Sequence, residues 1–237
     1  MQISSRFAKR LIGFGNRLVD CPAPKSFLGT LLGEAGVNLV FDIGANRGQY
    51  AERLRDIGYA NTIVSFEPQK EAFGILSNKA NLDAAWHVVN VALGAAEGVA
   101  DLNITENSFS SSILSLRHEM TAIEPGLRNV ATEKVSIHKL DDYYGQFITN
   151  TTVAFLKLDV QGYEPSVISG ASATLHRCFG LQVEMALEPS YVGQALLPEV
   201  ITLINERDFR LIYLEPGFSD PHTGYTLEVD GYFVRTT

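Results

Sequence analysis

The stretch Phe41-Asp42-Ile43-Gly44-Ala45-Asn46-Arg47-Gly48 decides the fold of this chain. It ends the apolar run 39–43, which predicts a strand, and it leads into a helical pattern over about 48–57. Gly44 and Gly48 allow the backbone to turn sharply and to approach a ligand closely, while Asp42 and Asn46 place polar groups at the strand tip. The stretch therefore predicts a cofactor turn between a strand and a helix, although an ordinary connecting turn would explain it when taken alone.

A second motif, Ser65-Phe66-Glu67-Pro68, strengthens the cofactor interpretation. It places a carboxylate at the end of the next predicted strand, where it can accept both ribose hydroxyl hydrogens of a bound nucleoside. Glu67 by itself could be a solvated loop acid. The first turn lacks the full G-x-G-x-x-G pattern that holds a pyrophosphate, so a cofactor without phosphates is favoured over NAD.

Outward from these motifs, apolar β-branched runs alternate with helical patterns, as in βαβ units. The sequence predicts an α/β fold, a doubly wound and mainly parallel seven-stranded sheet of the Rossmann-like kind, in one domain over 36–237 that follows an N-terminal helical extension over 1–35. The predicted strands are 39–43, 62–66, 86–92, 153–158, 181–185, 209–214 and 232–235, with further strands at 99–104 and 134–140; the predicted helices include 69–81, a stripe at Val167, Ile168, Ala171 and Leu175, and 198–206. Ligands of such sheets bind outside the carboxyl ends of the strands.

A polar stretch with Asn107, Ser108, Ser110, Ser111 and Ser112 is a candidate lid, although loops without a role are as common.

Composition excludes several classes of protein. The chain has 19 basic and 27 acidic residues, a net charge of −8, which argues against a nucleic-acid partner. Its two cysteines have no zinc-ligand spacing, and no stretch is long and apolar enough to cross a membrane. The N-terminus makes a poor secretory signal. We therefore expect a cytoplasmic enzyme with a small-molecule or glycolipid partner.

The motifs together resemble the FkbM-type family of class I S-adenosylmethionine-dependent methyltransferases. The resemblance covers about 38–235 and rests on Phe41–Gly48, Glu67-Pro68, Val91-Ala92-Leu93-Gly94 with Gly98, and Leu156-Lys157-Leu158-Asp159-Val160-Gln161-Gly162-Tyr163-Glu164 with Gly170-Ala171. It implies an S-adenosyl-L-methionine cofactor, and O-methylation of sugars, glycolipids or secondary metabolites. It also implies roles for single residues. The methionine end of the cofactor would be bound by Asp42, Gly44, Asn46 and Gly48, and its ribose by Glu67. Asp159 would lie beside the transferred methyl group. Gln161 departs from the acid that family members often carry, which weakens any metal role at that position.

The stretch from Asp159 to Glu164, called the Asp159 block below, also indicates a catalytic role from its residue types alone. Asp159 follows a strand and Glu164 begins a helix, so two carboxylates can orient a hydroxyl, accept its proton or hold a divalent ion, although Glu164 also simply favours the positive end of its helix. A free aspartate is a weak base, so Asp159 needs help from burial, from Mg²⁺ or from a histidine, for which His138 is the best placed. Glu184 is a further acid near a strand end. The candidate catalytic residues are Asp159, Glu164 and His138; a metal site is left open, with Asp159 and Glu184 as its candidates.

Two other functions compete with methyl transfer. An NAD-linked oxidoreductase would also use Glu67, but the Asp159 block has no evident use in hydride transfer. A non-catalytic interaction module would have no reason to keep Asp42, Glu67 and Asp159 at strand tips. Homo-oligomerisation is undetermined by the sequence.

The N-terminal segment carries a separate prediction. Its apolar residues Ile3, Phe7, Leu11, Phe14 and Leu18 lie on one face of a helix, with basic residues interspersed. A helix of this kind within residues 1–20 can make peripheral contact with an anionic membrane, and the alternative is packing on the domain or on a second subunit.

Overall fold

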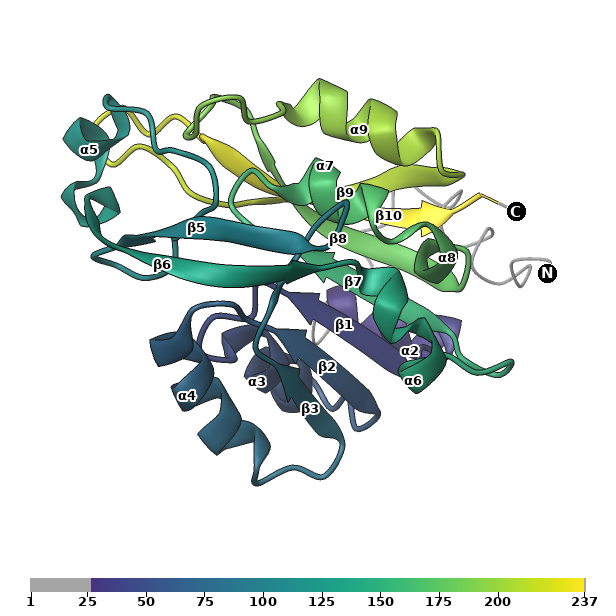
Figure 1. The fold of residues 1–237 in the computed structure, drawn as a ribbon. Helices are drawn as coiled ribbons and strands as arrows, with labels where there is room; N and C mark the ends of the chain where they lie inside the picture. The colour runs from purple at the N-terminus through teal and green to yellow at the C-terminus, as the bar shows by residue number, and fades with distance from the viewer. Residues whose placement is uncertain (1–26, 237) are drawn as a thin grey trace, which may run out of the picture.

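A seven-stranded sheet forms the centre of the protein in a computed structural model that describes residues 27–236. Its strands lie in the order β3-β2-β1-β7-β8-β10-β9 (Figure 1). Their bounds are β1 Leu39–Ile43, β2 Thr62–Phe66, β3 Trp86–Val89, β7 Ala154–Leu158, β8 Cys178–Ala186, β9 Phe209–Pro216 and β10 Glu228–Arg235. In this sheet β10 runs in the direction opposite to the other six strands. The strand order reverses between β1 and β7, which confirms the predicted doubly wound fold and places its switch point there.

Helices cover both faces of the sheet because successive strand residues face opposite sides. On one face, α2 (Phe27–Ala35), α3 (Gln49–Asp56) and α4 (Lys70–Ala80) pack over Val40, Ile63 and Phe155. On the other, η2 (Leu140–Tyr143), α6 (Tyr144–Phe147), α7 (Glu164–Ser169), α8 (Ser172–Leu175) and α9 (Leu197–Asn205) lie against a core that includes Phe41 and Leu156. In Figure 1, α6 and α8 lie in front of the sheet and α2 behind it. The result is a three-layer domain.

The strands predicted at 99–104 and 134–140 form a second sheet. It has three strands in the order β4-β6-β5, with bounds β4 Ala92–Leu93, β5 Gly98–Thr105 and β6 Asn129–His138, and β5 and β6 lie side by side in Figure 1. The predicted strand 86–92 is thereby split into β3 and β4. The break falls at Asn90, whose side-chain amide donates to the carbonyl oxygens of Glu67 and Pro68. The chain therefore leaves the main sheet at Asn90, next to the loop that begins at Glu67.

The apolar stripe after β7 forms two short helices rather than one. The first, α7, ends where Gly170 meets the backbone of Gly94 so closely that a Cβ at Gly170 would collide with the Gly94 carbonyl oxygen. The second, α8, begins under a side-chain cap, because the Asp141 carboxylate accepts hydrogen bonds from the backbone N–H groups of Ala173 and Thr174. The contact between Gly94 and Gly170 joins two of the motif blocks singled out in the sequence.

The predicted membrane-facing stripe over residues 1–20 lies outside the described residues. Of the predicted N-terminal extension, 27–35 form α2, whose Leu28, Leu31 and Leu32 are buried in the core of the domain. Within residues 27–236, no helix is both long enough and apolar enough to cross a bilayer.

Candidate active site

A cavity of 540 Å³ opens at the carboxyl ends of β1, β2, β7 and β8. One part is lined by the turn after β1, by Glu67 and by the apolar residues Val91, Ala92 and Leu93. Another part is lined by polar groups from β7, β8 and β10 and the segments that follow them, among them Asp159, Gln161, Gln182, Glu184, Tyr191, Glu228 and Asp230. This is the position that the fold predicts for a ligand, and the size suits a small molecule.

The turn after β1 brings two strand ends into backbone contact. Gly44 has a φ of 76°, and a Cβ built on it would collide with the backbone carbonyl oxygen of Asp159. Gly48, with a φ of 90°, has no room for a side chain either, because a Cβ there would lie 2.7 Å from the Trp86 ring. Both glycines are therefore required by the local geometry, and Gly44 holds the cofactor turn against the Asp159 block.

Glu67 is buried with its carboxylate fixed from both sides. Its Oε2 accepts a hydrogen bond from the backbone N–H of Asn46 at 2.7 Å, and its Oε1 accepts one from the backbone N–H of Gln69 at 2.8 Å. Burial raises the pKa of Glu67 to about 7, against the lowering effect of these two bonds. Each oxygen keeps a further lone pair, so a rigid carboxylate faces the cavity where two hydroxyl donors could bind it.

A row of polar side chains crosses the sheet beneath the cavity. Ser65, Asp42, Lys157 and Gln182 are register neighbours on β2, β1, β7 and β8. Asp42 is fully buried, and it accepts a hydrogen bond from Ser65 Oγ at 2.9 Å while its Oδ1 lies 3.4 Å from Lys157 Nζ. Asp42 is thus absent from the cavity lining. Its position supports the turn from below and gives no direct contact with a ligand.

Lys157 is the cation of this row, and its role was not predicted from the sequence. Its ammonium donates to the Gly44 carbonyl oxygen at 2.9 Å and lies 3.3 Å from Asp159 Oδ2. Burial disfavours the charged amine, but Asp159 and Asp42 outweigh this effect and raise the pKa of Lys157. A lysine inside the otherwise apolar run 153–158 was the sequence signal for this buried ion-pair centre.

Asp159 lies in the cavity between a cation and an amide. Its Oδ2 faces Lys157, and its Oδ1 accepts a hydrogen bond from Gln161 Nε2 at 2.9 Å. The same Gln161 nitrogen donates to Glu184 Oε2 at 2.7 Å. The structure therefore brings together Asp159 and Glu184, which the sequence placed at the ends of two different strands.

Two further acids, Glu228 and Asp230, extend this wall of the cavity along β10. Asp230 is the register partner of Glu184, and Glu228 lies two residues before it on the same face. Burial, together with the nearby charges of Asp159 and Glu228, raises the pKa of Glu184 well above its usual value. Burial and the charge of Asp159 likewise raise the pKa of Glu228 to about 7. Sequence reasoning missed both β10 acids, because neither follows a strand end that the motifs marked.

The other two predicted catalytic residues lie outside the cavity lining. Glu164 is buried, and its Oε1 accepts hydrogen bonds from the backbone N–H groups of Val160 at 2.9 Å and Gly162 at 3.2 Å. It therefore closes the turn that carries Gln161. His138 ends β6 in the second sheet, where its Nδ1 lies 2.9 Å from the Tyr143 hydroxyl. This geometry gives both residues structural contacts and no direct access to a ligand.

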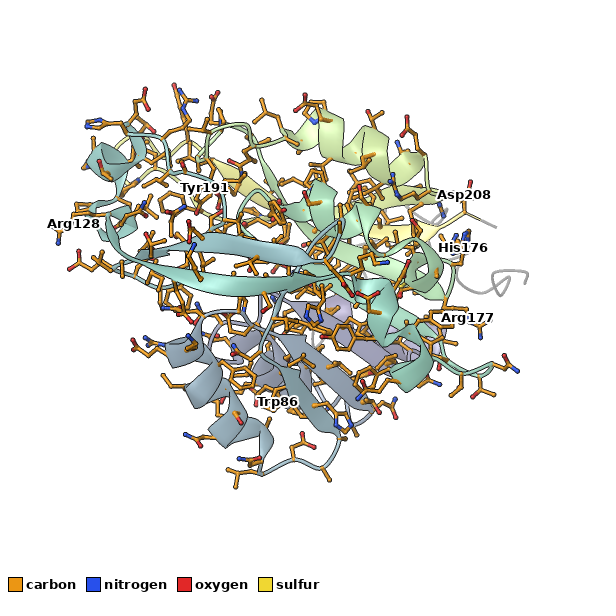
Figure 2. All side chains as sticks on the ribbon, viewed as in Figure 1. Trp86, Arg128, His176, Arg177, Tyr191 and Asp208 are labelled. Atoms are coloured by element: carbon orange, nitrogen blue, oxygen red, sulfur yellow. The ribbon has the colours of Figure 1, made fainter. Side chains whose placement is uncertain are left out.

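The serine-rich segment 107–112 lines the cavity, as expected of a lid. Asn46 Nδ2 donates to the Ser108 carbonyl oxygen at 2.9 Å, and Ser112 Oγ donates to the Gln161 carbonyl oxygen at 2.7 Å. The hydroxyl of Tyr191 lies 2.7 Å from the Ser110 carbonyl oxygen. Figure 2 shows Tyr191 on the same side of the molecule as β5 and α5 (Met120–Ile123), the helix that precedes η1 (Pro125–Leu127). The segment is thus tied to both the cofactor turn and the Asp159 block.

The predicted metal candidates do not form a metal-ligand cluster. Among residues 27–236, no group of three or more His, Cys, Asp or Glu side chains has the geometry to hold an ion. The Asp159 oxygens face an ammonium and an amide N–H group, which are both donors. A divalent cation needs oxygen ligands on every side, so this donor set does not fit Mg²⁺.

A comparison with known protein families identifies the family of the chain. The model of the methyltransferase FkbM domain family matches residues 42–211. No curated protein matches the chain.

Several solved structures are similar in fold. One is a magnesium protoporphyrin IX methyltransferase from Synechocystis PCC 6803 with bound S-adenosylmethionine, at 11% identity and a TM-score of 0.46 over 98% of this chain and 92% of that one. Another is a Burkholderia thailandensis 1,6-didemethyltoxoflavin-N1-methyltransferase, at 9% identity and a TM-score of 0.48 over 91% and 79%. A third is an rRNA methylase from Streptococcus thermophilus, at 10% identity and a TM-score of 0.48 over 90% and 97%.

Proposed function

The chain belongs to the FkbM family of S-adenosylmethionine-dependent methyltransferases, and we propose that it methylates a hydroxyl oxygen of a sugar, a glycolipid or a secondary metabolite. The family assignment favours methyl transfer over the NAD-linked and non-catalytic alternatives. One observation carries the proposal: Glu67 and Asp159 line the same cavity, one at each of two strand ends. Glu67 could therefore bind the cofactor while Asp159 contacts the acceptor in the same cavity.

The residues of the first part of the cavity fit the cofactor. Glu67 presents a fixed carboxylate for two ribose hydroxyls, and Val91, Ala92 and Leu93 provide an apolar wall for a flat base. When bound, S-adenosylmethionine would supply an electrophilic methyl group on a positively charged sulfur. The carboxylate of Asp159 would lie in the same space and stabilise that charge.

The second part of the cavity favours a hydroxyl-bearing acceptor. Asp159, Glu184, Glu228 and Asp230 present carboxylate oxygens, which accept hydrogen bonds from O–H groups. In the reaction, the acceptor oxygen forms a bond to the methyl carbon as the carbon–sulfur bond breaks, and the hydroxyl proton passes to a carboxylate. Burial raises the pKa of Glu184, which makes it a stronger base than a solvated acid. Asp159 would align the hydroxyl, and either carboxylate can take the proton.

A labelling experiment tests the proposal. The protein is incubated with S-adenosylmethionine carrying a tritiated methyl group and with three acceptor pools: free sugars, glycolipids and hydroxylated small molecules. We expect label in one pool, in a product that survives mild alkali, because a methyl ether resists hydrolysis and a methyl ester does not. Label found only on nitrogen or in an alkali-labile ester would refute O-methylation while leaving methyl transfer intact.

A further inference from the structure

Gln161 bridges two carboxylates of the cavity with a single amide. Its Nε2 lies 2.9 Å from Asp159 Oδ1 and 2.7 Å from Glu184 Oε2, so both N–H donors are used. The nitrogen of the amide, which carries its donors, is thus the atom that faces the two carboxyl groups. Gln161 Oε1 accordingly points the other way, 2.8 Å from the Tyr191 hydroxyl.

The backbone of Gln161 is held in a conformation that a side chain rarely adopts. Its φ is 55°, and the next residue, Gly162, has a φ of 93°. A left-handed conformation is unfavourable at a residue other than glycine, so other contacts must hold it in place. Three do so: Ser112 Oγ donates to the Gln161 carbonyl oxygen, and Glu164 accepts from the N–H groups of Val160 and Gly162 on either side.

We infer that Gln161 is a positioning residue that holds Asp159 and Glu184 together as a neutral bridge, in the place where a divalent cation would otherwise join two carboxylates. A cation there would have to displace the amide from both oxygens. It would also lie close to the Lys157 ammonium, which is 3.3 Å from the other oxygen of Asp159. The bridge therefore joins the acids without a metal and leaves their remaining lone pairs free for an acceptor. The positioning role rests on the proposed function, whereas the bridge itself does not.

Metal binding gives the first test, because Gln161→Glu would place a third carboxylate between the other two. We expect wild-type protein to bind no Mn²⁺ in a titration followed by electron paramagnetic resonance, and its melting temperature to be unchanged by Mg²⁺. Gln161→Glu should bind one Mn²⁺ ion and should melt at a higher temperature in Mg²⁺ than in EDTA. Stoichiometric Mn²⁺ binding by the wild type, lost in Asp159→Asn, would overturn the inference.

The pH dependence of melting gives the second test. Gln161→Met keeps the size of the side chain but removes both donors, so Asp159 and Glu184 lose their bridge. Its melting temperature should fall further below that of the wild type at pH 8 than at pH 5.5, because burial raises the pKa of Glu184 and that acid is more protonated at the lower pH. Tyr191→Phe, which keeps the Nε2 contacts, should show a much smaller difference between the two pH values. An equal deficit for Gln161→Met at both values would indicate a merely structural role. Neither test requires cofactor or acceptor, so each can be interpreted even if the protein fails to bind S-adenosylmethionine.

Discussion

Lys157 and Asp42 are register partners on adjacent parallel strands, and their Nζ and Oδ1 atoms lie 3.4 Å apart in the centre of the protein. The same ammonium donates to the Gly44 carbonyl oxygen and faces Asp159. One buried cation therefore connects a carboxylate inside the sheet, the cofactor turn and the candidate catalytic acid. Through these contacts, Lys157 links the two halves of the site.

Replacing Lys157 with methionine should destabilise the protein strongly. The change leaves Asp42 buried without its counter-ion, and breaking a buried ion pair costs about 3–5 kcal/mol. Urea denaturation measures the loss. Lys134→Met is the matched control, because Lys134 pairs with Asp101 at 3.0 Å on the exposed surface, where such pairs contribute about 0–1 kcal/mol. Adding Asp42→Asn to Lys157→Met should recover part of the stability; equal losses for the two lysine variants would contradict this account.

The two glycines Gly44 and Gly58 separate backbone strain from steric exclusion. Both have positive φ, 76° and 89°, but a Cβ at Gly58 meets nothing within 4 Å, whereas one at Gly44 collides with the Asp159 carbonyl oxygen. Gly58→Ala should therefore cost only the conformational penalty of about 1–2 kcal/mol. Gly44→Ala should cost more and should also abolish binding of S-adenosylhomocysteine, measured by calorimetry. Similar melting temperatures for the two variants would mean that the turn can open without loss.

The sequence predicted the main sheet well because its strands carry strong local signals. The runs that became β1, β2 and β7 are mostly apolar, as expected of strands buried on both faces, and the observed bounds of β1 and β2 are the predicted ones. The second sheet could not be assigned from the sequence, since the mixed polar and apolar residues of β5 and β6 predict strands but not the strands with which they pair. The chain leaves the main sheet at Asn90, whose side chain bonds to residues 22 and 23 positions away.

Much of the site was predictable from residues at or near strand ends. Glu67, Asp159 and Glu184 were found in this way, and all three line the cavity, as does the predicted lid stretch 107–112. Glu228, Asp230 and Tyr191 reach the same cavity through the antiparallel pairing of β10 and the loop after β8, which no local pattern encodes. Asp42 and Glu164, which were also predicted as site residues, lie outside the cavity lining, because a polar residue near a strand end can also be turned inward to hold the backbone.

Glu67→Ala should weaken the binding of S-adenosylhomocysteine by at least about tenfold. The change leaves the buried ribose hydroxyls without acceptors, at a cost of about 1–3 kcal/mol, and it frees the Asn46 N–H group. Isothermal titration measures the affinity. Glu71→Ala is the control, since its exposed side chain lies four residues later on α4 and makes a long surface ion pair with Arg47, at 3.9 Å. If both variants bind as the wild type does, Glu67 is not the ribose acceptor.

The free protein should become less stable as the pH rises from about 5 to 8. Burial raises the pKa values of Glu67, Glu164 and Glu228 to about 7, above the usual 4.5. Over this window the folded state binds more protons than the unfolded state, so the stability that these groups contribute is lost as they ionise. Thermal melting across the range measures the slope. Glu164→Gln, which can still accept the two backbone hydrogen bonds, should flatten it, and stability that rises with pH would contradict the assigned directions.

Asp159→Asn should lower kcat by a factor on the order of a hundred while leaving the affinity for S-adenosylhomocysteine nearly unchanged. The substitution preserves the shape of the side chain, and its remaining oxygen can still accept from Gln161, but it removes the charge that faces the sulfonium and the acceptor hydroxyl. It also removes one of the two acids beside Lys157, so a modest fall in melting temperature is expected and must be measured alongside the rate. Asp101→Asn is the control, because that acid makes only a surface ion pair on β5. The rate is measured with the acceptor that the labelling screen identifies. A variant with wild-type kcat would exclude Asp159 from the chemistry, and one whose cofactor affinity falls as far as its kcat would show that Asp159 shapes the cofactor site instead.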